Sequence, residues 1–423
     1  MATTPSRRRI VAAGTVGNVL EWYDFAIYGY FAPTIGRTFF PGQDPVAQVL
    51  AAFGVFAVGY LMRPLGGAVV GHIGDRYGRR MALIFSMAAM AMPTFLVGLL
   101  PGYATIGLMA PVLLTLLRTI QGLSVGGEWT TSFVFLIEHA DPKRRGLTGA
   151  IGWCGGIFGI LLGSAVGTLF NGLLTPEQLD AWGWRIPFLF GLIAGGTGLM
   201  LRRGLTDVAE VAMGARPERS PLIETLRHHG ALVARLAGVC AFCAVSFYLI
   251  FLYLVSWLQT VDGVAPARSL GINTASMAAL MPIDLFFGWL GDRVGRRPVL
   301  LLALAFAFVS AVPLFWLMHH PEPIYLLMGE LGFVLSLGAF LGVLPVFLVE
   351  ATDPALRCTT ISLGYNIATG LFGGVTPLAA TWLVERTTMD LSPAFMIMAA
   401  ALVSFVFVLG FAAPAAERAP AAA

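Results

Sequence analysis

The sequence predicts an all-α membrane protein whose twelve transmembrane helices form two six-helix bundles. The first observation is composition: hydrophobic residues make up 57% of the 423 residues. Charged residues make up only 12%, about half of the roughly 25% usual in soluble domains. The second is the recurrence of apolar stretches of about 20 residues, the length that crosses a bilayer as a helix. The third is a charged turn that occurs once in each half of the chain.

Composition also excludes several classes of protein. So few charges cannot cover the surface of a soluble protein of this size, and the hydrophobic content excludes a disordered chain. A net charge of +3 gives no reason to expect a nucleic-acid partner. The alternating apolar and polar pattern of membrane barrels is absent, so the spans must be helices.

Twelve apolar stretches, separated by turn or charge signals, are the expected helices. Three arginines precede the first stretch, but Glu21 and Asp24 interrupt it and no cleavage site follows. It is therefore expected to be a retained span rather than a signal peptide. The twelve stretches fall near 11–36, 46–72, 81–100, 106–138, 147–170, 184–201, 231–260, 272–290, 298–318, 324–349, 359–384 and 394–412.

The longest polar connection runs from about 202 to 230 and divides the helices six plus six. Within it, Ser220-Pro221 is a favourable helix start, with serine as N-cap and proline at the first helical position. We expect four parts: an N-terminal bundle 1–203, a cytoplasmic linker 204–230, a C-terminal bundle 231–412 and a disordered cytoplasmic tail 413–423.

The basic residues predict the orientation of the chain. If the N-terminus is cytoplasmic, 20 of the 26 arginines and lysines fall in cytoplasmic segments, and Arg202 at the end of the sixth span is counted among them. Both termini are therefore expected in the cytoplasm. The connections on the opposite side hold only Arg37, Arg185, Arg268 and Arg386.

A repeated pattern supports the division into halves. The turn Gly74-Asp75-Arg76-Tyr77-Gly78-Arg79-Arg80 follows the second span, and Gly291-Asp292-Arg293-Val294-Gly295-Arg296-Arg297 follows the eighth. A second pattern, an acid followed by Asp-Pro and Arg, recurs after the fourth and tenth spans. Parallel six-helix repeats are typical of one transporter architecture.

The duplicated G-D-R-x-G-R-R turn resembles the signature turn of the major facilitator superfamily. Five further segments are distinctive: Gly17-Asn18-x-x-Glu21-Trp22-Tyr23-Asp24-Phe25, Arg63-Pro64-Leu65-Gly66-Gly67, Arg118-x-x-Gln121-Gly122-x-x-x-Gly126-Gly127-Glu128, Gly183-Trp184-Arg185-Ile186-Pro187-Phe188 and Ser362-Leu363-Gly364-Tyr365-Asn366. They resemble one branch of the superfamily, the metabolite:proton symporters. That resemblance implies the major facilitator fold and proton-driven uptake of small carboxylates or zwitterions such as organic acids, proline and betaines.

Carboxylates inside the first bundle are the candidate proton-coupling residues. A charge near the bilayer centre costs at least about 2.5–3.5 kcal/mol on insertion scales, so each one needs a reason. Glu21 and Asp24 are three residues apart on one helix face and cannot both ionise easily, which suits proton carriage. Glu128 in span four is the third candidate. The alternative for Glu21 and Asp24 is a structural hydrogen bond, and the sequence does not separate them.

Arg118 is the candidate carboxylate binder, because a guanidinium offers a bidentate fork. Gln121 lies one turn away and faces the same way. Arg118 and Glu128 lie about 7 Å on either side of the centre of span four, too far apart to pair, so each needs a partner on another helix, a cavity water or a ligand. The alternative for Arg118 is a salt bridge with Glu21 or Asp24, which is compatible with binding if the bridge opens during transport.

The second bundle has no arginine or lysine inside the membrane, but it has Asp284 and Glu330. This asymmetry disfavours a di- or tricarboxylate and fits a ligand with a cationic nitrogen, held by Asp284 and by aromatic rings such as Tyr23 and Tyr248. The alternatives are a second titrating site, plain packing for the aromatics, and hydration of Glu330 at the outer interface.

The candidate gating residues lie mainly at the repeated turns. The resemblance implies contacts of each aspartate with arginines and with a helix N-terminus, whereas the plain interpretation is charge that sets topology. Glycines at strict four-residue spacing in span five, Gly155 to Gly167, predict close helix packing. The gating candidates are Arg63, Asp75, Arg79, Arg80, Asp292, Arg296 and Arg297.

The function predicted is secondary active transport: proton symport of a small carboxylate-bearing metabolite by alternating access in the bacterial inner membrane. A zwitterion or monocarboxylate is favoured over a di- or tricarboxylate. Open alternatives are a proton-coupled efflux antiporter, a uniporter and a sensor with a transporter fold. Clustered catalytic groups, a nucleotide-binding loop and metal motifs are absent from the sequence, so neither an enzyme nor a cofactor is expected. The expected partners are substrate, proton and lipid bilayer, and the chain is expected to be a monomer.

Overall fold

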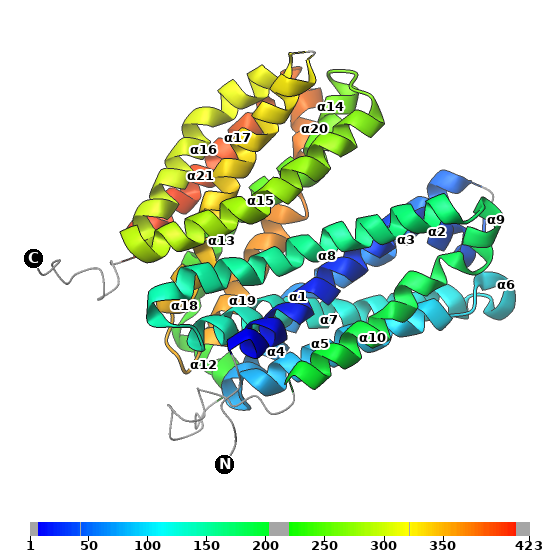
Figure 1. The fold of residues 1–423 in the computed structure, drawn as a ribbon, viewed down its shortest axis with the longest axis horizontal. Helices are drawn as coiled ribbons and strands as arrows, with labels where there is room; N and C mark the ends of the chain where they lie inside the picture. The colour runs from blue at the N-terminus through cyan, green and yellow to red at the C-terminus, as the bar shows by residue number, and fades with distance from the viewer. Residues whose placement is uncertain (1–6, 43, 203–219, 321, 412–423) are drawn as a thin grey trace, which may run out of the picture. The chain divides into compact units, whose positions relative to one another are not determined.

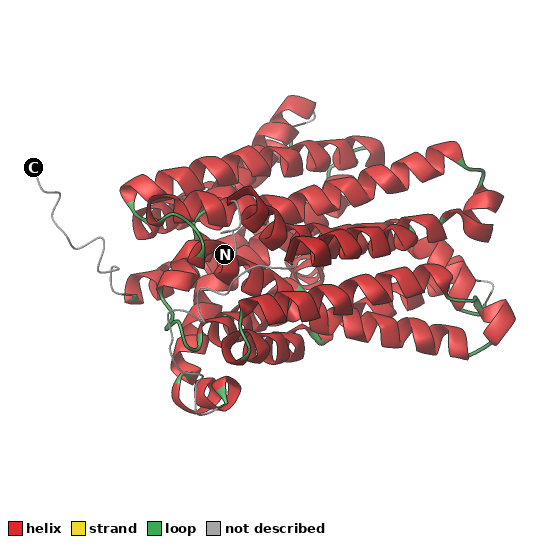
Figure 2. Ribbon diagram, turned by 60° about the horizontal axis from the view of Figure 1, so that its bottom comes forward, coloured by secondary structure: helices red, strands yellow, loops and turns green. Residues whose placement is uncertain are grey.

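The computed structural model describes residues 7–42, 44–202, 220–320 and 322–411. Every regular element among these residues is a helix (Figure 2). The first part of the chain forms α1 (Arg7–Tyr30), α2 (Ala32–Phe39), α3 (Pro45–Leu61), α4 (Arg63–Arg76), α5 (Arg79–Leu99), α6 (Tyr103–Ile106), α7 (Met109–Glu138), η1 (Pro142–Arg144), α8 (Arg145–Leu173), α9 (Pro176–Gln178), η2 (Leu179–Gly183) and α10 (Arg185–Arg202) (Figure 1).

The second part of the chain begins with α12, which starts at Pro221, as the Ser220-Pro221 signal predicts. Most of the predicted linker and the predicted tail lie outside the described residues. The elements are α12 (Pro221–His228), α13 (Gly230–Tyr248), η3 (Leu249–Tyr253), α14 (Leu254–Thr260), α15 (Pro266–Val294), α16 (Arg296–Met318), α17 (Pro323–Leu341), α18 (Leu344–Glu350), α19 (Arg357–Ala368), η4 (Thr369–Gly373), α20 (Thr376–Thr387) and α21 (Ser392–Gly410).

Each of the twelve predicted spans corresponds to one of these helices or to a broken run of them. Ten helices in the described part of the chain are long and apolar enough to cross a membrane, and the pair around Trp184, bent by 41°, makes eleven. The twelfth is α1, whose 24 residues extend about 36 Å. Its sequence includes Asn18, Glu21 and Asp24, which lower its hydropathy and which are all buried.

The chain forms two compact units. Unit 1 comprises Met1–His139 and Gly155–Ile223, and unit 2 comprises Ala140–Cys154 and Glu224–Ala423. The start of α8 therefore groups with unit 2 and the rest of α8 with unit 1. The bundle boundaries expected at 203 and 230 stay a prediction.

Glycines bring α7 against α3 and α4 in unit 1. A Cβ at Gly122 would lie 2.0 Å from the carbonyl oxygen of Gly59, and a Cβ at Gly126 would lie 2.0 Å from that of Arg63. From the opposite side, a Cβ at Gly66 would lie 2.2 Å from the carbonyl oxygen of Leu123. Only glycine permits such a close approach of two helix backbones. This close packing of α7 against α3 and α4 determines where the polar side chains of α7 lie inside unit 1.

The glycine stripe of α8 packs against α1, as its four-residue spacing predicts. A Cβ at Gly155 would lie 2.2 Å from the Thr15 side chain, and one at Gly159 would lie 2.4 Å from the Val19 carbonyl oxygen. Gly163 faces Ala26 in the same way. The helix that carries Glu21 and Asp24 is therefore held over several turns by close backbone contact.

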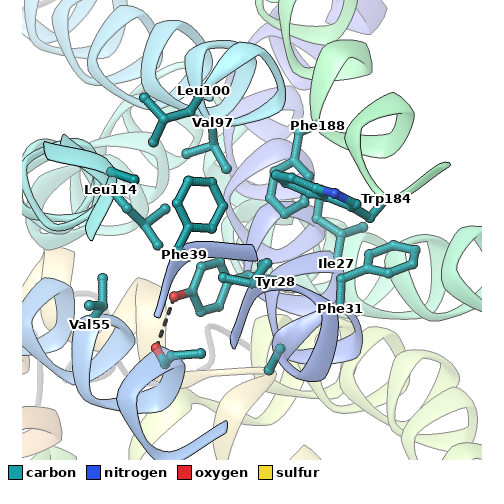
Figure 3. Packing of buried hydrophobic residues seen from close by; sticks show 14 of the residues in the cluster. Ile27, Tyr28, Phe31, Phe39, Val55, Val97, Leu100, Leu114, Trp184 and Phe188 are labelled. Carbon is teal, nitrogen blue, oxygen red and sulfur yellow. Dashed lines mark hydrogen bonds between the residues drawn. The ribbon is translucent and has the colours of Figure 1, made fainter. Parts of the chain in front are cut away.

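A hydrophobic cluster rich in aromatic residues lies in the interior of unit 1. Its buried members come from α1, α2, α3, α5, α7, η2, α10 and the turns that join them, and Figure 3 shows the Tyr28 ring among them beside Phe39, Val55 and Leu114. The Tyr28 hydroxyl donates to the Ala52 carbonyl oxygen at 2.9 Å (Figure 3). This bond fixes the tyrosine ring, one face of which is used in the polar site described below.

In unit 2, α13 packs against α19 and α21, and α17 packs against α15 and α16. Two turns of π-helix, η3 and η4, interrupt the runs α13–α14 and α19–α20. The η4 turn lies against α13, where a Cβ at Gly373 would lie 2.6 Å from the ring of Tyr248. Tyr248 is thus held at an irregular turn of the helix, a position that is often functional.

Candidate functional site

A buried network in unit 1 centres on Asp24 of α1. One carboxylate oxygen accepts from Arg118 Nη1 of α7 at 2.5 Å. The other accepts from Thr94 Oγ1 of α5 at 2.8 Å and from Gln121 Nε2 at 3.0 Å. The guanidinium carbon of Arg118 lies 3.7 Å from the centre of the Tyr28 ring. The ion pair with Asp24 is the alternative that the sequence left open for Arg118.

This network leaves part of Arg118 unused. Among the described residues, its Nε and Nη2 atoms have no hydrogen-bond partner although they are buried, and the same holds for Gln121 Oε1. Nε and Nη2 are the pair of donors that a carboxylate accepts bidentately. A buried donor without a partner costs about 1–3 kcal/mol, more when it is charged. The free edge of Arg118 is therefore suited to an anionic group that is not part of the protein.

Glu128 has a partner that the sequence did not reveal. Its Oε1 accepts from Arg202 Nη2 of α10 at 2.5 Å, and Oε2 accepts from the Ser86 hydroxyl of α5. Arg202 also donates to the carbonyl oxygens of Ala13 and Leu83. The pair is fully buried and joins α1, α5, α7 and α10. Arg202 was counted among the cytoplasmic charges from its sequence position, but its side chain lies in the interior of unit 1.

Glycine makes room for this pair on α1. A Cβ at Gly17 would lie 1.6 Å from Glu128 Oε1 and 2.6 Å from Arg202 Nη2. The Gly17-Asn18 segment of the first span is thus explained by packing: glycine admits the ion pair, and Asn18 Oδ1 accepts from the Ser132 hydroxyl at 3.1 Å.

Glu21 has no such partner. Its side chain is 1% exposed, and neither carboxylate oxygen has a hydrogen-bond partner among the described residues. Of the three candidate proton-coupling acids, Asp24 and Glu128 are ion-paired, whereas Glu21 is paired with no basic residue that the structure describes.

Two further candidates of unit 1 have other neighbours. Arg63 is buried at the start of α4, and its guanidinium lies 4.9 Å from the centre of the Tyr60 ring. The Tyr23 hydroxyl donates to the Pro187 carbonyl oxygen at 2.9 Å, so it holds α1 to α10. A role of either residue in gating or binding remains a prediction.

Unit 2 holds Asp284 and Glu330 in a different setting. Both are buried, and within the described residues neither Asp284 oxygen nor Glu330 Oε1 has a hydrogen-bond partner. No arginine or lysine in the described part of unit 2 is buried. Glu330 is thus enclosed by protein in this structure rather than hydrated at an interface.

The repeated turn has the same geometry in both units. Gly78 and Gly295 both have positive φ, 99° and 96°, which only glycine adopts readily. Arg79 pairs with Asp75 at 2.8 Å and with Glu138 at 3.3 Å. In the second copy, Arg296 pairs with Asp292 at 3.1 Å and with Glu350 at 3.3 Å.

The last arginine of each repeated turn makes the same kind of hydrogen bond in both units. Arg80 donates to the carbonyl oxygen of Arg202 at 3.2 Å, at the end of α10. Arg297 donates to that of Leu409 at 2.8 Å, near the end of α21. Each turn is therefore tied to the last long helix of its half of the chain.

Asp292 makes the helix N-terminus contact that the resemblance implies. Its carboxylate accepts from the backbone N–H groups of Gly146 and Leu147, at 2.8 and 3.0 Å, at the start of α8. A carboxylate at this position satisfies free helix donors and complements the helix dipole. Whether it acts as a gate remains a prediction.

A sequence profile of the Major Facilitator Superfamily matches residues 15–353 of this chain. The chain belongs to the major facilitator superfamily. A proline/betaine transporter of Salmonella typhimurium (strain LT2) is 34% identical over 411 residues, which cover 94% of this chain and 82% of that protein. The glycine betaine/proline/ectoine/pipecolic acid transporter OusA of Dickeya dadantii (strain 3937) is 33% identical, with the same coverage.

Solved structures agree on the fold of this superfamily member. The proton:xylose symporter XylE bound to 6-bromo-6-deoxy-D-glucose superposes with a TM-score of 0.74 at 18% identity, covering 95% of this chain and 94% of the other. The human organic anion transporter TETRAN gives a TM-score of 0.71 at 16% identity, covering 96% and 100%. The fold class and the family predicted from the sequence are confirmed. The protein is a multi-pass membrane protein and a secondary transporter rather than an enzyme.

Proposed function

We propose that the protein takes up a small zwitterionic carboxylate, of the proline or betaine type, together with a proton. The observation that carries the proposal is the buried edge of Arg118, whose Nε and Nη2 atoms have no hydrogen-bond partner among the described residues. Gln121 Oε1 beside it has none among them either. These atoms would receive the substrate carboxylate. The printed names of the relatives, proline/betaine transporters, support a substrate of this class.

The charge of the site favours one carboxylate over three. Among the described residues, the buried arginines all lie in unit 1, and each of them is within reach of an acid or an aromatic ring. Within the same residues, Arg118 still keeps an edge, Nε and Nη2, that has no hydrogen-bond partner. A tricarboxylate would bring more negative charge than one free guanidinium edge can balance. Asp284 and Tyr248 remain the proposed contacts for the cationic nitrogen, because a buried carboxylate without a partner and an aromatic ring both attract a cation.

Three acids of unit 1, Glu21, Asp24 and Glu128, are the proposed coupling group, and the repeated turns are the proposed gates. Both termini are proposed to lie in the cytoplasm, in a bacterial inner membrane, on the distribution of basic residues. Alternating access would expose Arg118 to each side in turn, and the Arg118–Asp24 pair would loosen as the substrate carboxylate arrives.

The test is uptake of radiolabelled glycine betaine and proline into proteoliposomes that contain the purified protein. An inward proton gradient should drive accumulation above equilibrium, and a protonophore should abolish it. Accumulation driven by an outward proton gradient would instead favour the antiporter, and transport indifferent to the gradient would favour the uniporter. A citrate-like tricarboxylate as the best competitor would overturn the proposed substrate class.

A further inference from the structure

We propose that Glu21, rather than Asp24 or Glu128, is the residue that binds the transported proton. This inference rests on the proposed function, because it names the proton site of a proton-coupled transporter. Asp24 and Glu128 each accept a hydrogen bond from an arginine nitrogen at 2.5 Å. Both carboxylate oxygens of Glu21 are buried and have no hydrogen-bond partner in the described part of the chain. An arginine-paired carboxylate gives up its partner when it is protonated, and Glu21 has no partner to lose.

The position of Glu21 places it between the two ion pairs. Gly17, Glu21, Asp24 and Tyr28 are spaced by three or four residues and so share one face of α1. On this face, Gly17 abuts the Glu128–Arg202 pair, while Asp24 and Tyr28 contact Arg118. With 1.5 Å of rise per residue, Glu21 lies about 6 Å along the helix from Gly17 and about 4.5 Å from Asp24. Glu21 is therefore close enough to interact electrostatically with both the Glu128–Arg202 pair and the Asp24–Arg118 pair.

The charges that surround Glu21 couple it to the substrate. From α7 these are Arg118 and Glu128, from α10 Arg202, from α4 Arg63, and from α1 itself Asp24. With Glu21 ionised, its charge together with Asp24 and Glu128 balances the three arginines. With Glu21 protonated, the group has a surplus of one positive charge, and Arg118 still offers a free edge.

A substrate carboxylate would restore the balance that protonation of Glu21 removes. Binding at Arg118 is then favoured when Glu21 holds a proton and disfavoured when Glu21 is ionised. By linkage, the proton and the carboxylate stabilise each other and are carried together. On release, the substrate leaves and the O–H bond of Glu21 breaks, with the proton passing to water.

The other buried acids without partners do not have this arrangement. Asp284 and Glu330 lie in unit 2, where no arginine or lysine is buried among the described residues. Protonation of Glu330 would not alter the balance of charge around a buried arginine. Glu330→Gln is therefore the matched control, because it makes the same chemical change at a site that is equally buried.

The experiment follows proton and substrate movement in proteoliposomes with glycine betaine as the probe, using an entrapped pH dye and radiolabel. Glu21→Gln should reduce accumulation driven by the proton gradient at least tenfold and remove betaine-induced proton entry, whereas exchange of internal for external betaine should fall less. Glu21→Asp should retain part of the proton entry. Glu330→Gln should keep proton entry and accumulation within about twofold of the wild type.

The outcomes separate this inference from the proposed function. If the wild type moves no protons with betaine or proline, the proposed function fails. If the wild type moves protons and Glu21→Gln still does so at the same stoichiometry, only the assignment of Glu21 is overturned.

A second measurement uses the unaltered protein, in case Glu21→Gln does not insert. The hydrophobic reagent dicyclohexylcarbodiimide reacts with protonated carboxyl groups: the carboxyl proton moves to a carbodiimide nitrogen, the carboxyl oxygen bonds to the central carbon, and rearrangement leaves a stable N-acylurea. Mass spectrometry should find this adduct on Glu21, with Glu330 as the internal positive control. Adducts on Asp24 or Glu128 with none on Glu21 would overturn the inference.

Discussion

In unit 1 the buried carboxylates Asp24 and Glu128 face buried arginines, whereas in unit 2 Asp284 and Glu330 have no buried basic residue to face within the described chain. The two units share the repeated turn and its ion pairs, so the contrast is confined to their interiors. A buried ion pair holds its helices together, and protonation of its carboxylate would break the pair. A buried acid without a partner makes no such link between helices and can be protonated without breaking one. The contrast underlies the proposal that the interior of unit 1 binds the substrate carboxylate.

The largest effect is expected from breaking the Glu128–Arg202 pair. Arg202→Ala leaves Glu128 buried and unpaired, which typically costs about 3–5 kcal/mol, and should lower the thermal stability of the detergent-solubilised protein strongly. The control is Arg37→Ala, because the Arg37–Asp180 pair is 48% and 41% exposed. Exposed pairs contribute about 0–1 kcal/mol. Equal shifts for both variants would show that the buried pair is not the clamp described here.

The next effect concerns the free edge of Arg118. Arg118→Lys replaces the fork by a point charge and should weaken glycine betaine binding by about 1.5–3 kcal/mol, roughly 10- to 150-fold. Binding is measured by ligand-induced thermal shift or calorimetry, with Arg37→Lys as the control. Wild-type affinity in Arg118→Lys would mean that the carboxylate binds elsewhere.

A smaller effect is expected from the repeated turns, where the units are alike. Asp75→Asn and Asp292→Asn each keep the shape of the side chain but remove the charge from an aspartate–arginine pair. Hydrogen bonds to charged groups contribute about 1.5–3 kcal/mol, so we expect uptake rates to fall about tenfold with normal amounts of protein in the membrane. Unchanged uptake would reduce the turns to a role in topology.

The smallest effect tests the interior of unit 2. Asp284→Asn should weaken binding of glycine betaine by a few-fold, about 1 kcal/mol, because one attraction to a cationic nitrogen among several is lost. The matched ligand is 3,3-dimethylbutanoate, in which a carbon replaces the nitrogen of glycine betaine, and its binding should be unaffected. A uniform loss for both ligands would indicate disturbed packing rather than a contact with the nitrogen.

The fold was accessible from the sequence because bilayer length, charge bias and the repeated turn act locally and leave clear patterns. The prediction that Arg118 and Glu128 do not pair with each other and need other partners was also correct, and both partners lie on other helices. The packing predicted for the glycine stripe of α8 is likewise observed. The partner of Glu128 was not accessible. Arg202 stands beside Arg203 at the end of a span, where an arginine is normally solvated, and only the meeting of four helices shows it to be buried.

The sequence also could not separate Glu21 from Asp24. Both lie on one helix face, and their difference arises from α5 and α7, which supply Thr94, Arg118 and Gln121 to one carboxylate and nothing to the other. Which carboxylate meets these side chains depends on how closely α7 packs against its neighbouring helices at its glycines. That packing distance cannot be read from the pattern of residues along the sequence.

The most direct test of the central claim, that the interior of unit 1 links a substrate carboxylate to a proton, is the ratio of protons to glycine betaine entering proteoliposomes at clamped zero membrane potential. A pH dye and radiolabel followed on the same vesicles give both rates. The account predicts a fixed non-zero ratio, with entry of betaine stimulated by external acid and net accumulation abolished by a protonophore. Betaine entry without proton movement, at a rate independent of the pH gradient, would contradict it.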